Sequence, residues 1–221
     1  FMGETNSHLM LLLDTSASMG FGSASTSKLQ YGKYLGASLA YLSSRQHDAI
    51  GVMLFDDDVV DYRPPASKVG SLQGVIHTLD KAEASMGTDI NKPMNRFREH
   101  VKKRGLVAVI SDFYCEAEEL LENIRPLAMH GQDVIMFHLL DSDELDPKIK
   151  QSTLYEDMET GQAIEVEPTY MAKAYREKIQ NHIKNIEEAA NGIRADHVLI
   201  NTADPLDKAL HNYLTFREKR G

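Results

Sequence analysis

The stretch Leu9-Met-Leu-Leu-Leu-Asp14-Thr-Ser16-Ala-Ser18-Met-Gly20 decides the fold. An apolar run ends abruptly in an acid, and two serines follow at alternate positions before a glycine. A short apolar run bounded by turn residues is typical of a buried strand, although periodicity alone also allows a helix. As a strand, it places Asp14 at its carboxyl end, where open parallel α/β sheets hold ligands. A carboxylate and two hydroxyls on a turning loop can converge on one hard cation such as Mg²⁺.

Outward from this stretch, apolar strands alternate with amphipathic helices. The alternation predicts an α/β fold with a doubly wound, mostly parallel sheet and helices on both faces. A small β-hairpin insertion with a glycine turn is expected near 153–167. We expect a single domain over 1–221 that is part of a longer chain, because the first strand begins so soon after Phe1. The expected strands are 8–13, 50–55, 59–62 (closed by Pro64-Pro65), 106–110, 133–140 and 197–200, and the expected helices are 28–46, 68–82, 90–103, 116–130, 168–192 and 205–217.

Composition narrows the class of protein. The chain has 221 residues, of which 42% are hydrophobic and 26% charged, as in an ordinary globular protein. Its net charge of −9 disfavours a nucleic-acid partner, which needs clustered Lys and Arg. The single cysteine, Cys115, excludes an intrachain disulfide framework and favours a reducing, cytoplasmic compartment. No apolar run reaches the ~20 residues of a membrane span.

Hard oxygen ligands occur at loop positions in three separate places. The first is the Asp14, Ser16 and Ser18 loop, and the others supply Thr88 and Asp112. Asp14 and Asp112 each end a strongly apolar strand. Two such strands can flank the switch point of a doubly wound sheet, so that both acids face one crevice.

These residues resemble the metal-ion-dependent adhesion site of von Willebrand factor A domains, whose pattern is Asp-x-Ser-x-Ser, a distant Thr and a more distant Asp. All five positions match in type and order. Longer phrases resemble one bacterial subfamily of that fold, catalogued as domain of unknown function fifty-eight. The phrases are Asp14-Thr-Ser-Ala-Ser-Met19, Lys33-Tyr-Leu-Gly-Ala-Ser-Leu-Ala-Tyr41, Leu54-Phe-Asp-Asp57, Gly87-Thr-Asp89, Ile110-Ser-Asp-Phe113, Tyr155-Glu-Asp-Met-Glu-Thr-Gly161 and Asp204-Pro-Leu-Asp207.

The resemblance implies a protein-binding module and not an enzyme. Ser16, Ser18 and Thr88 would bind Mg²⁺ directly or through water, and Asp14 and Asp112 would coordinate it or hold its waters. Mn²⁺ or Ca²⁺ would suit the same oxygens. The sixth position would take an Asp or Glu carboxylate from a protein partner. Members of this subfamily are commonly encoded beside MoxR-type AAA+ ATPases. Such an ATPase is therefore the expected partner protein, in the assembly or maturation of other proteins.

Two other functions stay open. One is an Mg²⁺-dependent phosphatase or phosphotransferase with Asp14 as nucleophile. Against it, Ser16 stands where haloacid-dehalogenase-type phosphatases carry their general acid. The other is a scaffold with a vestigial metal site. Two smaller alternatives also stay open. Asp89 either caps the next helix or reaches the metal through water, and the acidic turn 56–58 either is solvated or binds a second cation together with Asp61.

Overall fold

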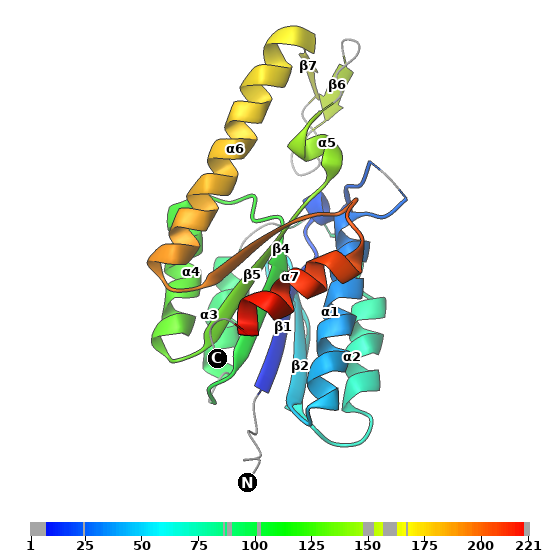
Figure 1. Cartoon of the computed structure of the whole chain (residues 1–221), viewed down its shortest axis with the longest axis vertical. Coiled ribbons are helices and arrows are strands. Elements are labelled where there is room, and N and C mark those ends of the chain that lie inside the picture. Colours follow the sequence, from blue (N-terminus) through cyan, green and yellow to red (C-terminus); the bar gives the residue numbers. More distant parts are fainter. Residues whose placement is uncertain are drawn as a thin grey trace.

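The computed structural model describes residues 8–23, 25–85, 87, 90–100, 103–147, 153–156, 163–166 and 168–218. Its centre is a six-stranded sheet in the order β3-β2-β1-β4-β5-β8, and every neighbouring pair is parallel except β2 and β3 (Figure 1). The predicted doubly wound, mostly parallel sheet is therefore confirmed. The strands are β1 (His8–Asp14), β2 (Ala49–Phe55), β3 (Val59–Ala66), β4 (Leu106–Ser111), β5 (Asp133–Leu140) and β8 (Asp196–Asn201).

Helices cover both faces of this sheet (Figure 1). One face packs against α1, α2 and α7, and the other packs against α3, α4 and α6. Side chains of β1 alternate between these two cores, with Leu11 and Leu13 on the first side and Leu12 on the second. The helices are α1 (Lys28–Arg45), α2 (Ser71–Asp80), α3 (Asn91–His100), α4 (Ala117–Met129), α5 (Ser142–Leu145), α6 (Pro168–Gly192) and α7 (Leu206–Glu218), with a 3₁₀ turn η1 (Ala17–Gly20).

The strand order places the switch point of the sheet between β1 and β4. These two strands pair in parallel from Leu9 with Leu106 to Leu13 with Ile110, so they end side by side at one edge. The chain leaves β1 toward β2 on one side, whereas β5 continues the sheet on the other side of β4. The loops after β1 and β4 therefore diverge and leave a crevice between them, as the sequence predicted.

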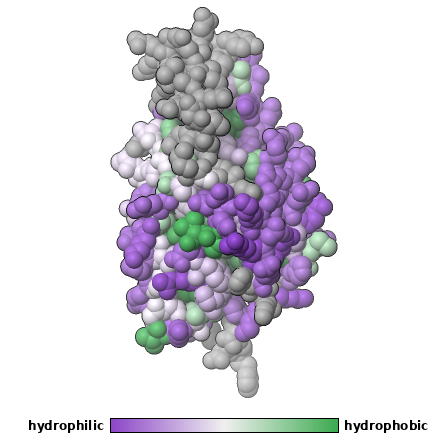
Figure 2. Space-filling view, turned by 180° about the vertical axis from the view of Figure 1, so that it is seen from behind, coloured by the Kyte–Doolittle hydropathy of each residue, from purple (hydrophilic) through white to green (hydrophobic). Residues whose placement is uncertain are grey.

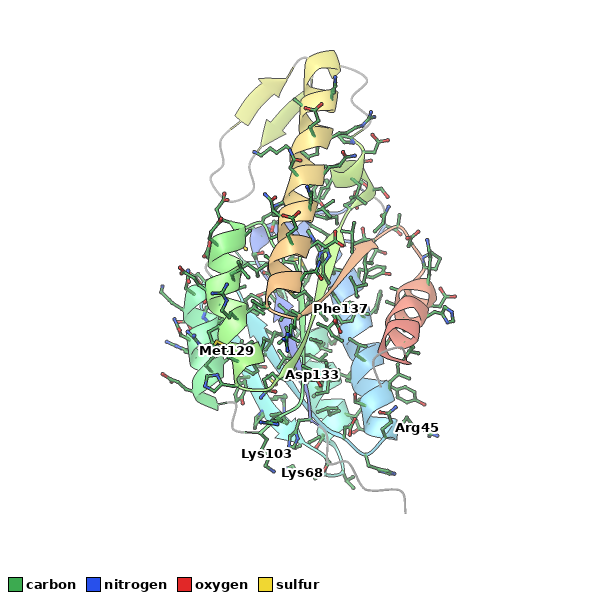
Figure 3. All side chains as sticks on the ribbon, turned by 60° about the vertical axis from the view of Figure 1, so that its left-hand side comes forward. Arg45, Lys68, Lys103, Met129, Asp133 and Phe137 are labelled. Carbon is green, nitrogen blue, oxygen red and sulfur yellow. The ribbon has the colours of Figure 1, made fainter. Side chains whose placement is uncertain are left out.

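The amino ends of the strands mark the opposite edge. Figure 3 shows Lys103 and Asp133 there, with Phe137 farther along β5 inside the molecule. Asp133 is exposed, and its backbone N–H donates to the carbonyl of Gly105 at 2.9 Å. It offers a matched acidic control at a distance from the crevice.

A separate two-stranded hairpin lies beyond the carboxyl edge of the sheet, beside the first turns of the long helix α6 (Figure 1). Its strands β6 (Thr153–Glu156) and β7 (Ala163–Val166) pair antiparallel, which confirms the hairpin insertion predicted near 153–167. The glycine turn predicted for it falls on 157–162, outside the described residues.

Three details of the fold differ from expectation. β3 continues through both prolines to Ala66 instead of ending before them, because it is an edge strand with an irregular register opposite Gly51. The short elements η1 and α5 were not predicted, since each has only four residues and no periodicity to show.

Among the described residues, no helix is long and apolar enough to cross a membrane. Viewed from behind, the surface is mainly hydrophilic, with a small hydrophobic spot near its middle (Figure 2).

Candidate metal centre

Asp14 is the last residue of β1 and is only 7% exposed. Its Oδ1 accepts a hydrogen bond from the backbone N–H of Ser16 at 2.8 Å, and its Oδ2 accepts one from Ser111 Oγ at 2.5 Å. The first bond bends the chain into the loop after β1, and the second ties that loop to the end of β4. Each carboxylate oxygen still has a lone pair for a ligand.

The loop after Asp14 is held in place from two sides. Thr15 donates its N–H and its hydroxyl to the carbonyl of Phe55, at 2.7 and 3.0 Å, and the N–H of Ser85 donates to the carbonyl of Thr15 at 2.8 Å. This anchoring brings Ser16 Oγ and Ser18 Oγ within 3.2 Å of each other. Neighbouring ligands of an octahedral Mg²⁺ with ~2.1 Å bonds lie about 3.0 Å apart. The two hydroxyls therefore have the spacing of adjacent ligands.

Asp112 follows β4 and is 2% exposed. Its Oδ2 is 2.7 Å from the ammonium of Lys28, while its Oδ1 receives only a long contact of 3.4 Å from the N–H of Tyr114. One oxygen of Asp112 is thus committed to an internal ion pair, and the other is nearly free for a further ligand.

A cavity of about 80 Å³ lies between these loops and is bordered by both Asp14 and Asp112. Burial and the negative charge of Asp112 together raise the pKa of Asp14 from 3.8 to about 6. The two carboxylates are therefore close enough to repel each other. A divalent cation between them would cancel this repulsion.

Thr88 and Asp89 lie outside the described residues, so the position predicted for Thr88 at the metal and the two roles left open for Asp89 stay predictions. The chain on either side does reach the site. Ser85 binds the carbonyl of Thr15, and Ile90 borders the same cavity. Of the five predicted ligands, the structure brings Asp14, Ser16, Ser18 and Asp112 to one edge of the sheet.

The acidic turn 56–58 divides between several roles. Asp56 borders the cavity and accepts a hydrogen bond from Ser85 Oγ at 2.5 Å, Asp57 is exposed, and Asp58 pairs with Arg96 at 3.0 Å. Neither the solvated turn nor a second cation site is tested by these contacts. Cys115 also borders the cavity, and burial raises its thiol pKa to about 12, so the thiol is neutral at physiological pH.

The sequence did not point to Lys28, Glu144 or Tyr114, yet all three surround Asp112. Lys28 has no exposed surface, and Glu144 is buried on the short helix α5. A signal for Lys28 was present, because a cation in the first turn of a helix is disfavoured by the helix dipole and needs an acidic partner. Nothing in the sequence indicates that the partner of Lys28 is Glu144, since 116 positions separate them.

Oxygen atoms dominate the polar groups of this region: Asp14, Asp56, Asp112, Glu119 and Ser111 border the cavity, and the hydroxyls of Ser16 and Ser18 lie on the loop that follows Asp14. Such a set suits Mg²⁺, Mn²⁺ or Ca²⁺ better than a soft metal. No cluster of three or more His, Cys, Asp or Glu residues with metal-binding geometry occurs in the described parts of the chain. Any cation here would therefore depend on the serine hydroxyls and on water as well.

The architecture is that of a von Willebrand factor A-like fold. The SpRpn10 VWA domain has a similar structure, with a TM-score of 0.51 and 12% identity over 93% of this chain and 94% of that one. Two other solved structures are also similar. BatB from Bacteroides thetaiotaomicron gives a TM-score of 0.64 at 16% identity and covers 96% and 99% of the two chains. An aerotolerance-related membrane protein from Bacteroides fragilis gives 0.63 at 18%, over 92% and 94%. At these identities the likeness concerns the fold.

Within this class, the chain belongs to the family described as protein of unknown function DUF58, whose model matches residues 1–210. The family predicted from the sequence is therefore confirmed. The comparison with curated proteins gave no match.

Proposed function

We propose that this domain is a protein-binding module whose Mg²⁺ site accepts a carboxylate from its partner. The fold supports the coarser statement, since a von Willebrand factor A-like domain suggests a protein-interaction module. The finer one is supported by Asp14 and Asp112, which border one cavity, and by Ser16, whose N–H binds Asp14 and whose hydroxyl lies beside that of Ser18. Thr88 completes the proposed ligand set.

The bound cation supplies a positive centre that an acidic side chain can coordinate. Asp14 and the two serines hold the cation from the loop after β1, and Asp112 faces it from the loop after β4. Two carboxylates balance its charge and leave a centre that still accepts one anionic oxygen. In a chain with net charge −9, the cation lets an acidic partner approach and selects a partner with Asp or Glu at the contact.

The proposed partner protein is a MoxR-type AAA+ ATPase, and the proposed process is assembly or maturation of other proteins. Support for this part comes from the family to which the chain belongs, whose members are commonly encoded beside such ATPases. The proposal assigns this domain a binding role and no catalytic step.

Metal binding is the first test. Mn²⁺, which is paramagnetic and suits the same oxygens, is titrated into the purified chain and followed by electron paramagnetic resonance. Asp112→Asn and Ser18→Ala should each weaken binding by about tenfold or more, as loss of a metal ligand does. Asp133→Asn, at the far edge of the sheet (Figure 3), is the matched control and should leave affinity unchanged.

Partner capture is the second test. The purified domain is immobilised and offered a purified MoxR-type AAA+ ATPase, with Mg²⁺ or with EDTA. Retention that needs Mg²⁺ and is lost in Asp14→Ala supports the proposal. Retention unaffected by EDTA and by Asp14→Ala would contradict the metal-dependent part of it. Mg²⁺-dependent phosphate release that disappears in Asp14→Asn would favour the phosphatase instead.

A further inference from the structure

Lys28 is a fully buried lysine at the first position of α1, directly behind the proposed metal site. Its ammonium lies 2.7 Å from Asp112 Oδ2 and 2.6 Å from Glu144 Oε1. It also lies 4.9 Å from the centre of the Tyr114 ring, at cation–π distance. Burial opposes the charge on Lys28, but the two carboxylates outweigh it and raise the lysine pKa, so the ammonium stays charged.

Glu144 is fixed in this arrangement from its other side. Its Oε2 accepts the backbone N–H of Asp141 at 2.7 Å, and Asp141 in turn caps α5 in a capping box. The Asp112–Lys28–Glu144 triad is therefore a buried, tightly held set of charges that reaches the cavity through Asp112.

The charges around the cavity decide what it can bind. Asp14, Asp56, Asp112 and Glu119 border the cavity and are negative when ionised. Behind Asp112, Lys28 adds one positive charge and Glu144 adds one negative charge, so the surroundings are negative overall and favour a cation.

We propose that Lys28 and Glu144 form a charge-setting pair for the metal site, in which Lys28 is a resident cation that lowers affinity for a divalent metal and keeps the loaded site receptive to a carboxylate. This inference rests on the proposed function, because it assigns roles to residues beside that same site. Neither residue is proposed as a metal ligand. Both act through the field that they impose on the cavity and through the position of Asp112.

Three variants separate charge from structure. Glu144→Gln removes one negative charge from behind the cavity, so Mn²⁺ affinity should fall about tenfold at pH near 7.5. The double variant Lys28→Met with Glu144→Gln restores the original net charge and should return affinity to within about threefold of the unmodified chain. Lys28→Met alone should bind Mn²⁺ at least as tightly as the unmodified chain.

Acetate gives an independent readout as a stand-in for the partner carboxylate. It is titrated against the Mn²⁺-loaded protein, and binding is followed by the relaxation of water protons. Glu144→Gln makes the loaded centre more positive, so acetate should bind several-fold more tightly while Mn²⁺ binds more weakly. A merely structural defect would weaken both. Opposite changes in the two affinities therefore identify a charge effect.

Lys33→Met is the matched control, because Lys33 lies on the same helix and its ammonium binds the carbonyl of Asp80, on α2. It should change neither affinity by more than about twofold. The inference is overturned if the double variant stays as weak as Glu144→Gln, or if a folded Lys28→Met binds Mn²⁺ more weakly than the unmodified chain. If the unmodified chain does not bind Mn²⁺ at all, the proposed function fails together with this inference. If the unmodified chain binds Mn²⁺ but the variants do not behave as described, only this inference fails.

Discussion

Replacing Asp14 by asparagine should stabilise the protein in the absence of metal. The structure places this carboxylate in a buried site beside Asp112, which raises its pKa from 3.8 to about 6. Each factor of ten in proton affinity corresponds to about 1.4 kcal/mol, so ionised Asp14 costs about 3 kcal/mol of stability at neutral pH. Asparagine keeps the acceptor for the Ser16 N–H but loses the charged acceptor for Ser111. We therefore expect a net gain of about 2 kcal/mol.

The pH dependence of this gain follows from the direction of the shift. Between pH 3.8 and about 6 the folded chain holds the Asp14 proton more tightly than the unfolded chain does. The contribution of Asp14 to stability therefore falls as pH rises through this window, and Asp14→Asn avoids that loss. The difference between variant and unmodified protein should be largest above pH ~6 and should nearly vanish by pH ~4.

The assay is thermal unfolding in EDTA at several pH values, with urea unfolding as a check. A gain of about 2 kcal/mol raises Tm by about 5 °C for a chain of this size. Asp133→Asn removes the same charge at the far edge and should change Tm little. With saturating Mg²⁺ the order should reverse, since only the unmodified chain gains from the ligand. A destabilised Asp14→Asn, or a gain that does not depend on pH, would refute the reasoning.

Three further substitutions test other parts of the structure by urea unfolding. Gly51→Ala should cost about 2 kcal/mol, because its Cβ would lie 2.8 Å from the carbonyl oxygen of Arg63 and from the nitrogen of Pro65; an unchanged midpoint would contradict the close approach of β3. Asp141→Asn should cost about 2 kcal/mol of stability at neutral pH, since hydrogen bonds to its carboxylate outweigh burial and lower the Asp141 pKa. This contribution should disappear as pH falls through the range below 3.8. A destabilisation that stays the same at every pH would contradict the prediction. Ile186→Ala should cost about 3 kcal/mol, because this α6 side chain is fully buried against the sheet face that also carries α4; a loss below about 1 kcal/mol would mean that α6 packs loosely.

Local sequence signals sufficed for the main elements of the fold. Central strands such as Leu106–Ile110 lie buried between two layers of helices and are therefore apolar on both faces. This continuous apolar composition identifies them in the sequence. α6 was predicted over its full length because it combines a proline start with a long apolar period. Pro64 and Pro65 misled the prediction of β3, since their tolerance in an edge strand depends on which neighbours the strand has.

The ligand positions of the candidate site were also accessible from sequence, because Asp14 and Asp112 each end an apolar strand and parallel strands end at a common edge. The surroundings of those ligands were not. Lys28 and Glu144 lie behind Asp112, and Tyr114 borders the cavity; these three residues meet only through the tertiary fold. Their separation in sequence carries no periodicity, so pattern analysis has nothing to detect.

Stability alone does not explain why a lysine occupies the start of α1. The helix dipole disfavours a cation there, and removing three charges from water costs more than an apolar packing of the same volume would. Replacing a buried ion triad by well-packed apolar side chains is often neutral or stabilising. The local conflict is therefore informative, because natural sequences keep such conflicts mainly at functional sites. Since the triad includes Asp112 and stands against the cavity that Asp14 borders, its effect falls on the charge of that cavity. That is the reason to look for the role of Lys28 in what the crevice binds and not in how the domain folds.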